Sequence, residues 1–184
     1  MTSPLMLDLC AGLGGASAAF RARGWDVVTV DNDPRFEPDV LVDVCSWSWD
    51  GPRPDFVWAS PPCVEFSRES MPWSRTGRAP SLDIVRACRR VIAECAPAYW
   101  VIENVRGAIR WLEPELGPYA AHYGPFYLWG VFPPLGLRLR MRAKESYSST
   151  QSAERAMIPP ALSRAMAIAV EAQIPLPLAV EEAT

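Results

Sequence analysis

Short apolar runs alternate with helix-like segments through the first half of the chain, and few architectures accept that order. The runs cover residues 5–9, 26–30, 40–44, 55–59 and 99–102. Segments 16–23 and 81–95 are predicted to be helices, most clearly 81–95, where apolar residues recur every three or four positions. Strands that alternate with helices favour a doubly wound, mainly parallel sheet covered on both faces. The sequence therefore predicts an α/β fold.

The last third of the chain has a different pattern. Apolar runs at 126–131 and 137–143 flank the turn-like sequence FPPLG, which predicts a C-terminal antiparallel β-hairpin. Three arginines alternate with apolar residues in the second run and would share one face, namely Arg138, Arg140 and Arg142. A proline at 159 or 160 can open a final helix that ends near Gln173.

Length and composition narrow the class of protein. The 184 residues fit one domain, 1–184, with no signal-peptide pattern and no apolar run that could span a bilayer. Five cysteines without C-x-x-C spacing, together with a single histidine, argue against a disulfide framework and against a metal site. We therefore expect reduced thiols and a cytoplasmic location.

Charge is distributed unevenly, although the net charge is only −3. Residues 1–59 hold 4 arginines and 9 acidic residues, whereas residues 60–144 hold 12 basic and 7 acidic residues. A basic central segment is compatible with binding to nucleic acid, and also with ordinary surface arginines. Within it, residues 66–81 are rich in Pro, Gly and Arg, which predicts a mobile loop.

The first apolar run leads into a glycine-rich turn, DLCAGLGG, at residues 8–15. A strand, such a turn and then a helix bring backbone N–H groups close to a ligand. The second run ends in Asp31, a position suited to binding ribose hydroxyls, or else simply in a solvated turn. Asp43, after the third run, could accept a hydrogen bond from an adenine amino group while Val44 packs on the ring. No basic residue follows the glycines, so the pattern favours an adenosine cofactor without a phosphate.

The motifs SPPCVEFS, residues 60–67, and Glu103-Asn104-Val105 complete a set that resembles the DNA (cytosine-5) methyltransferase family. Arg138-Leu139-Arg140 resembles that family's Arg-x-Arg motif, without the usual preceding Gln. DLCAGLGG resembles its first motif, although an aromatic residue is usual in place of Cys10. The resemblance is to a minimal phage or bacterial-type member, and it covers residues 5 to about 107 well and the rest loosely.

The resemblance implies a Rossmann-like fold and transfer of a methyl group from S-adenosylmethionine to C5 of cytosine in DNA. Cys63 would add to C6 as a thiolate nucleophile, held in a fixed direction by the two prolines before it. Glu103 would hydrogen-bond the N3–N4 edge of the base and assist protonation at N3, and Asn104 would brace the Pro-Cys segment. One arginine of the stripe, with Arg140 favoured, would hold O2, unless the stripe is a solvated edge strand.

These inferences give three sets of candidate residues. The catalytic set is Cys63, Glu103, Asn104, Arg138 and Arg140. The cofactor set is Asp8, Leu9, Cys10, Ala11, Gly12, Leu13, Gly14, Gly15, Asp31, Asn32, Asp43, Val44, Pro61 and Arg155. The DNA-contacting set is Ser67, Arg68, Met71, Trp73, Arg75, Arg78 and Arg142. The remaining cysteines and His122 are expected to be structural.

The chain departs from the family where most members insert a target-recognition domain. Only residues 143–157 stand there, too few to fold independently. The target base must still leave the duplex, so Met71 and Trp73 are predicted to wedge into the stack while nearby arginines hold phosphates. Base access could instead depend on a partner subunit that supplies recognition, or the substrate could be single-stranded DNA.

The donor and the substrate could also differ from those usual in the family. Arg155 stands where asparagine is usual, which would favour carboxy-S-adenosylmethionine as the donor if its guanidinium faces the sulfonium. RNA or a free deoxycytidine nucleotide could replace DNA. A non-catalytic cofactor-binding subunit of a DNA-modification complex is the candidate from another class. The family implies the cytoplasm of a bacterial or phage-infected cell.

Overall fold

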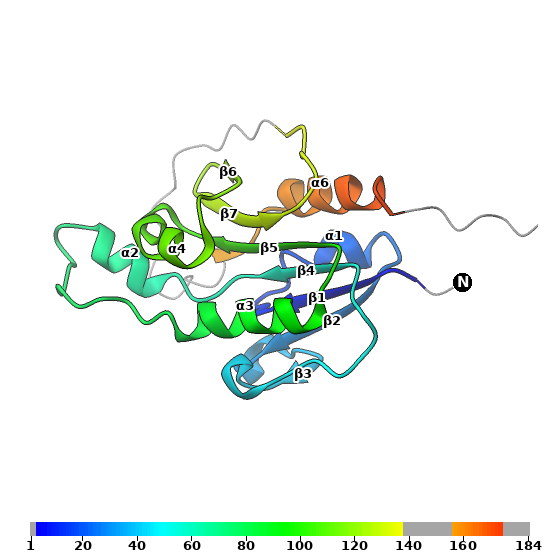
Figure 1. Ribbon diagram of the computed structural model, residues 1–184, viewed down its shortest axis with the longest axis horizontal. Helices are drawn as coiled ribbons and strands as arrows, with labels where there is room; N and C mark the ends of the chain where they lie inside the picture. The colour runs from blue at the N-terminus through cyan, green and yellow to red at the C-terminus, as the bar shows by residue number, and fades with distance from the viewer. Residues whose placement is uncertain (1–2, 138–155, 175–184) are drawn as a thin grey trace, which may run out of the picture.

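The computed structural model describes residues 3–137 and 156–174, which form a twisted sheet covered by helices (Figure 1). The strands are β1 (Leu5–Leu9), β2 (Asp26–Asp31), β3 (Val40–Leu41), β4 (Phe56–Ala59), β5 (Tyr99–Asn104), β6 (Ala121–Tyr123) and β7 (Phe126–Val131). The helices are α1 (Ala18–Arg21), α2 (Val64–Ser70), α3 (Asp83–Cys95), α4 (Ile109–Leu116) and α6 (Pro160–Glu171). Three short 3-10 turns join them: η1 (Pro34–Phe36), η2 (Val44–Ser46) and η3 (Arg106–Ala108).

The strand order in the described residues is β3-β2-β1-β4-β5-β7-β6. β1 pairs in parallel with β2 and β4, and β4 pairs in parallel with β5. The predicted doubly wound, mainly parallel sheet is therefore confirmed. Because parallel strands end at a common edge, the segments that follow β1, β2, β4 and β5 meet there.

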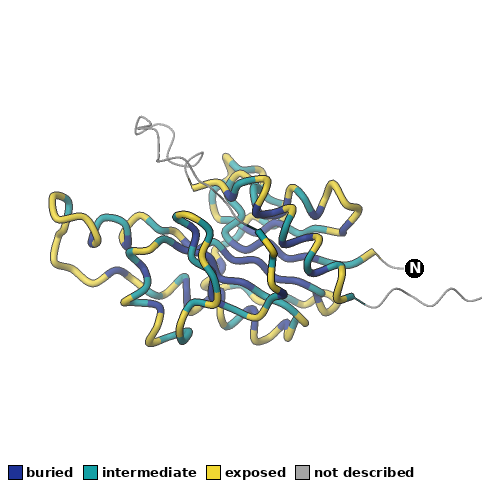
Figure 2. Tube along the Cα trace, turned by 90° about the horizontal axis from the view of Figure 1, so that it is seen from above, coloured by how far each residue is buried: buried dark blue, intermediate teal, exposed yellow. Residues whose placement is uncertain are grey.

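Each face of the sheet buries its own apolar cluster. On one face Leu7 packs with Val91 of α3, and on the other Met6 packs with Met166 of α6. The buried strands run as a central layer between partly exposed helices (Figure 2). The predicted apolar stripe of α3 faces the sheet, and it buries Val85, Cys88 and Val91 among others. No helix in the described parts of the chain is long and apolar enough to cross a membrane.

β7 has the predicted bounds and belongs to an antiparallel hairpin, which it forms with β6. It pairs with β5 along its other edge, whereas among the described residues β6 pairs only with residues 126–128. The predicted pairing of β7 with residues 137–143 depends almost entirely on residues outside those that the structure describes. The turn of the actual hairpin contains Gly124, whose φ of 59° favours glycine. Of the predicted second arm, residues 138–143 lie outside the described residues.

The bounds of two helices differ from those predicted. α2 occupies Val64–Ser70, so the first part of the predicted loop 66–81 is helical. The final helix α6 begins at Pro160, where the fixed φ of proline suits a first turn, and it ends at Glu171.

Candidate active site

A cavity of about 530 Å³ lies at the carboxyl edge of the sheet and joins the glycine turn to Cys63. The predicted cofactor residues that line it are Cys10, Ala11, Gly12, Leu13, Gly15, Asp31, Asn32, Asp43 and Val44. Asp8, Leu9, Gly14 and Pro61 do not line it. Arg155 lies outside the described residues.

The Asp31 carboxylate fixes the glycine turn at the wall of this cavity. Its Oδ2 accepts a hydrogen bond from the N–H of Gly12 at 2.9 Å, and its Oδ1 accepts from the N–H of Asp33 at 2.9 Å. Gly12 has a φ of 52°, a conformation that disfavours a side chain. Since each carboxylate oxygen has a second lone pair, Asp31 can still accept from a ligand hydroxyl.

Asp43 follows β3 and, like Asp31, holds a turn at the wall of the cavity. Its Oδ1 caps η2 by accepting from the N–H of Cys45 at 2.9 Å. Arg90 of α3 holds the same turn, because its Nη2 donates to the carbonyls of Val44 at 3.1 Å and Trp47 at 2.6 Å. The turn that presents Asp43 and Val44 to the cavity is therefore anchored to the longest helix described.

Several residues that line the cavity were missed by sequence reasoning, among them Phe36, Val42, Ile84, Met157 and Ile158. Met157 and Ile158 arrive from the far end of the chain. A side chain at Gly15 would meet the Met157 Cγ at 2.5 Å and the Ile158 backbone at 2.8 Å, so this segment covers the glycine turn closely. The apolar pair before Pro159 was the available signal, but nothing local to it indicated contact with the turn.

Cys63 lies directly before α2 as its N-cap residue, and it lines the cavity. The segment that carries it is held by Asn104 at the end of β5, whose Nδ2 donates to the carbonyl of Pro61 at 3.0 Å. α2 itself packs against η3, because a side chain at Gly107 would meet the carbonyl of Phe66 at 2.5 Å. Contacts at the end of β5 and at η3 thus hold the backbone on both sides of Cys63.

Glu103 is buried beside this segment, with 8% of its surface exposed. Burial raises its pKa to about 8, and a hydrogen bond with the Ser60 side chain opposes that rise only in part. The Trp58 indole donates to Ser60 Oγ at 2.8 Å, which leaves the Ser60 hydroxyl proton for the carboxylate. At neutral pH Glu103 is therefore mainly a protonated acid that can donate a hydrogen bond.

Asp8 is the other deeply buried acid near the site. Burial raises its pKa to about 7, and hydrogen bonds with the side chain and backbone of Ser17 oppose that rise in part. It lies behind the glycine turn rather than at the cavity wall. Asp8 is therefore better placed to support the glycine turn than to contact a ligand.

Apart from Arg142, the predicted DNA-contacting residues lie on α2 and on the segment after it, outside the cavity lining. Trp73 is 82% exposed and Met71 is 38% exposed. Arg75 and Arg78 are exposed, while Ser67 and Arg68 are half-buried on α2. The predicted arginine stripe lies outside the described residues, namely Arg138, Arg140 and Arg142.

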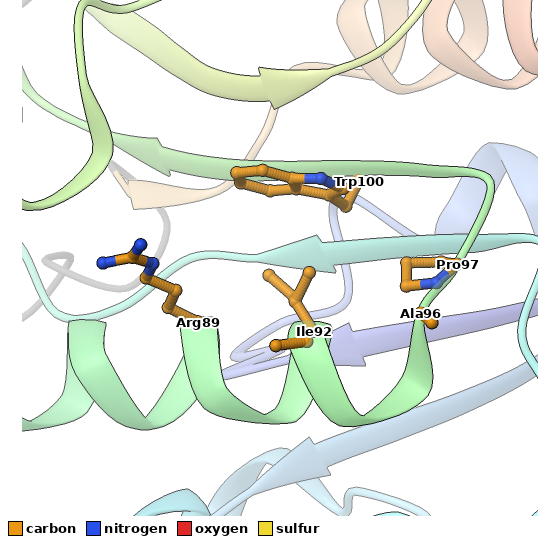
Figure 3. A pocket seen from close by; sticks show the side chains of 6 residues that line it. Arg89, Ile92, Ala96, Pro97 and Trp100 are labelled. Carbon is orange, nitrogen blue, oxygen red and sulfur yellow. The ribbon is translucent and has the colours of Figure 1, made fainter.

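A second cavity, of about 260 Å³, lies at the opposite end of α3 from Ile84 (Figure 3). Its lining includes Arg89, Ile92, Pro97 and Trp100. The Arg89 Nη1 donates to the Glu115 carbonyl at 2.8 Å. With no acid, thiol or hydroxyl in the lining, this cavity is a poor candidate for catalysis.

No protein-family model matches the chain. The structure is similar to that of the Entamoeba histolytica methyltransferase EhMeth, with a TM-score of 0.51 and 14% identity over 79% of this chain and 58% of that one. The chain therefore shares its fold with this methyltransferase.

Two curated proteins then specify the family. The chain is 31% identical over 144 residues to the Frog virus 3 protein named "Probable DNA (cytosine-5)-methyltransferase", covering 68% of this chain and 65% of that protein. It is 33% identical over 130 residues to the type II methyltransferase M.XorII of Xanthomonas oryzae, covering 58% of this chain and 29% of that protein. The chain thus spans just under two thirds of the first and less than a third of the second. The resemblance is confirmed: this chain is a relative of the DNA (cytosine-5)-methyltransferases.

Proposed function

We propose that the protein methylates C5 of cytosine in DNA, with S-adenosylmethionine as donor and Cys63 as nucleophile. The observation that carries this proposal is a single cavity that runs from the glycine turn and Asp31 to Cys63. Glu103 and Asn104 adjoin it at the end of β5. The Frog virus 3 relative, whose name is that of a probable DNA (cytosine-5)-methyltransferase, supports the same reaction.

The cavity residues fit an adenosine cofactor. Asp31 would hold the ribose hydroxyls and Asp43 the adenine amino group, with Val42 and Phe36 beside the ring. Arg35 also lines the cavity, but its guanidinium pairs with Asp33 at 2.5 Å, which leaves little positive charge for a phosphate. When bound, S-adenosylmethionine supplies an electrophilic methyl group.

The residues of the chain would activate the base. The Cys63 thiolate adds to C6 of cytosine, and Glu103 donates its proton toward N3, which makes C6 a better electrophile. Asn104 keeps the Pro61 carbonyl, and hence the Cys63 segment, in place. Loss of the C5 proton and elimination of Cys63 would then restore the aromatic ring and the thiol. One arginine of the stripe, with Arg140 preferred, would hold O2 of the base.

The segment after α2 would engage the nucleic acid. Trp73 has 82% of its surface exposed and Met71 has 38%, and an apolar side chain of this kind can fill the space of an unstacked base. Arg75 and Arg78 beside Trp73 would contact phosphates. This arrangement favours a polymer over a free nucleotide as the substrate.

Cofactor binding should stabilise the fold. At a concentration one hundred times its Kd, S-adenosylmethionine should add about 2.7 kcal/mol to the free energy of unfolding, visible as a higher Tm. Asp31→Ala should lose this shift, because it removes both the ribose acceptor and the anchor of Gly12. Carboxy-S-adenosylmethionine measured in parallel compares the two donors. A melting curve that neither compound moves would contradict the cofactor assignment.

Trp73→Ala should slow turnover on duplex DNA by about 10–100-fold and on single-stranded DNA by much less, because only the duplex must be unstacked. Arg78→Ala should weaken binding to both forms and reduce the salt dependence, as expected for a phosphate contact. Arg78 is a cleaner choice than Arg75, whose Nε already donates to the Glu69 carbonyl at 3.2 Å. Turnover on matched strands at two salt concentrations measures both effects. Equal losses on the two strand forms for Trp73→Ala would contradict a wedge.

A further inference from the structure

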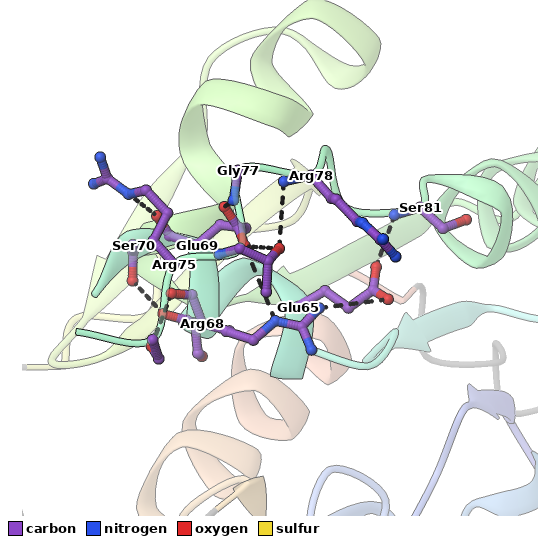
Figure 4. Close-up of polar contacts among 11 residues, drawn as sticks. Glu65, Arg68, Glu69, Ser70, Arg75, Gly77, Arg78 and Ser81 are labelled. Atoms are coloured by element: carbon purple, nitrogen blue, oxygen red, sulfur yellow. Dashed lines mark hydrogen bonds and ion pairs between the residues drawn. The ribbon is translucent and has the colours of Figure 1, made fainter. Parts of the chain in front are cut away.

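The carboxylate of Glu69 is buried although it lies in the last turn of a surface helix, and residues 71–78, here the wedge segment, fold over it (Figure 4). Only 2% of Glu69 is exposed. Its Oε1 accepts from the N–H of Thr76 at 2.7 Å and from the Thr76 hydroxyl at 2.6 Å. Its Oε2 accepts from the N–H of Gly77 at 3.2 Å. One carboxylate thus accepts hydrogen bonds from three donors in the wedge segment.

Backbone acceptors at the end of α2 hold the rest of the wedge segment. The Arg75 Nε donates to the Glu69 carbonyl at 3.2 Å, and the Ser74 hydroxyl donates to the Arg68 carbonyl at 3.0 Å. Gly77 has a φ of 75°, so the chain turns there in a conformation that favours glycine. The segment therefore folds back on α2 and leaves Trp73 at the outer bend.

Hydrogen bonds, rather than a close ion pair, compensate the Glu69 charge. The Arg68 Nε lies 4.0 Å from Oε1, whereas the Thr76 donors are within 2.7 Å. These hydrogen bonds lower the pKa of Glu69, so the group stays ionised at neutral pH. The segment buries little apolar surface of its own, because Met71, Pro72 and Trp73 are all exposed. Its shape therefore depends on satisfying this carboxylate.

We propose that Glu69 is a positioning residue that shapes the wedge segment and so presents Trp73 to the space left by the target cytosine. The inference rests on the proposed function, because it concerns access to a paired base. Glu69 does not face the cavity or Cys63. It acts by holding the segment in its bent form before DNA arrives, which spares the entropy of ordering a loop on binding.

The test compares four single variants with Trp73→Ala and with a double variant. Glu69→Ala removes the acceptors, Glu69→Gln keeps one of them, and Thr76→Val removes only the hydroxyl donor. Glu115→Gln is the matched control, because Glu115 pairs with Arg86 of α3 and neither residue lines the cavity. Two quantities are measured: the rate of tryptic cleavage after Arg75 and Arg78, which needs no enzymatic activity, and turnover on matched duplex and single-stranded DNA.

Glu69→Ala should speed cleavage about tenfold or more and lower duplex turnover about 10–100-fold, with single-strand turnover within about threefold of the unmodified protein. Glu69→Gln and Thr76→Val should fall between these values, and Glu115→Gln should match the unmodified protein. The double variant Glu69→Ala with Trp73→Ala should turn over duplex DNA no more slowly than Trp73→Ala alone. Both changes would disable the same step, the insertion of Trp73 into the duplex.

Unchanged cleavage, equal losses on both strand forms, or additive losses in the double variant would each overturn the positioning role. Equal losses would show that Glu69 only supports the fold. If the unmodified protein transfers no methyl group to either DNA form, the proposed function fails and the wedge role fails with it. The cleavage rates would then still decide whether Glu69 shapes the segment.

Discussion

Cys63→Ser should abolish methyl transfer, with a loss on the order of a thousandfold or more, while S-adenosylmethionine still raises the Tm. A serine hydroxyl at the same place is far less nucleophilic than a thiolate at neutral pH, so the bond to C6 does not form. The cavity walls that would hold the cofactor come from other residues, so binding should survive. Turnover and melting curves on the same preparation separate the two effects.

DNA that contains 5-fluorocytosine provides the direct test. The fluorine cannot leave as a proton does, so the protein should stay covalently attached to the base through Cys63. Mass spectrometry of the digested adduct identifies the residue. Cys45→Ser is the matched control, because Cys45 is an exposed thiol outside the cavity lining, and it should retain both turnover and trapping. An adduct on another cysteine, or an active enzyme that forms none, would refute the mechanism.

Glu103→Gln should lower turnover by about 10²–10⁴-fold, because the amide keeps the hydrogen-bonding shape but cannot deliver a proton. In the unmodified protein turnover should fall as the pH rises through about 8, where Glu103 loses the proton that it would donate. A full pH profile of turnover measures this decrease. A profile that stays flat to pH 9 would contradict a protonated Glu103 as the acid.

The same substitution should stabilise the protein at high pH. The pKa of Glu103 is about 8 in the folded state and near its ordinary 4.5 when unfolded. Its contribution to stability is therefore present in full below pH 4.5 and is lost as the pH rises through 8. Glu103→Gln cannot ionise, so its gain over the unmodified protein should be about 4 kcal/mol larger at pH 9 than at pH 5. Denaturant melts at the two pH values measure the difference, with Glu94→Gln as an exposed control.

Local patterns were enough to predict the sheet and the ends of its strands. The alternation of short apolar runs with the α3 stripe indicates parallel strands with helices on both faces, and the structure confirms this. Because parallel strands end at one edge, the order of motifs along the chain already places Asp31, Cys63 and Glu103 near one another. β6 was missed because its three residues carry too little periodicity to predict a strand.

The sequence by itself determined the fold class, the family resemblance and the chemical types at the site, since these depend on residue identity and spacing. Only the tertiary structure decided how those groups behave. Burial between strands raises the pKa of Glu103 to about 8, and the contact of Met157 with Gly15 closes the cavity from a remote segment. Glu69 belongs to no motif recognised in the sequence, yet its carboxylate accepts hydrogen bonds from Thr76 and Gly77. Desolvation and contacts between distant segments arise only when the chain is packed, so no local pattern records them.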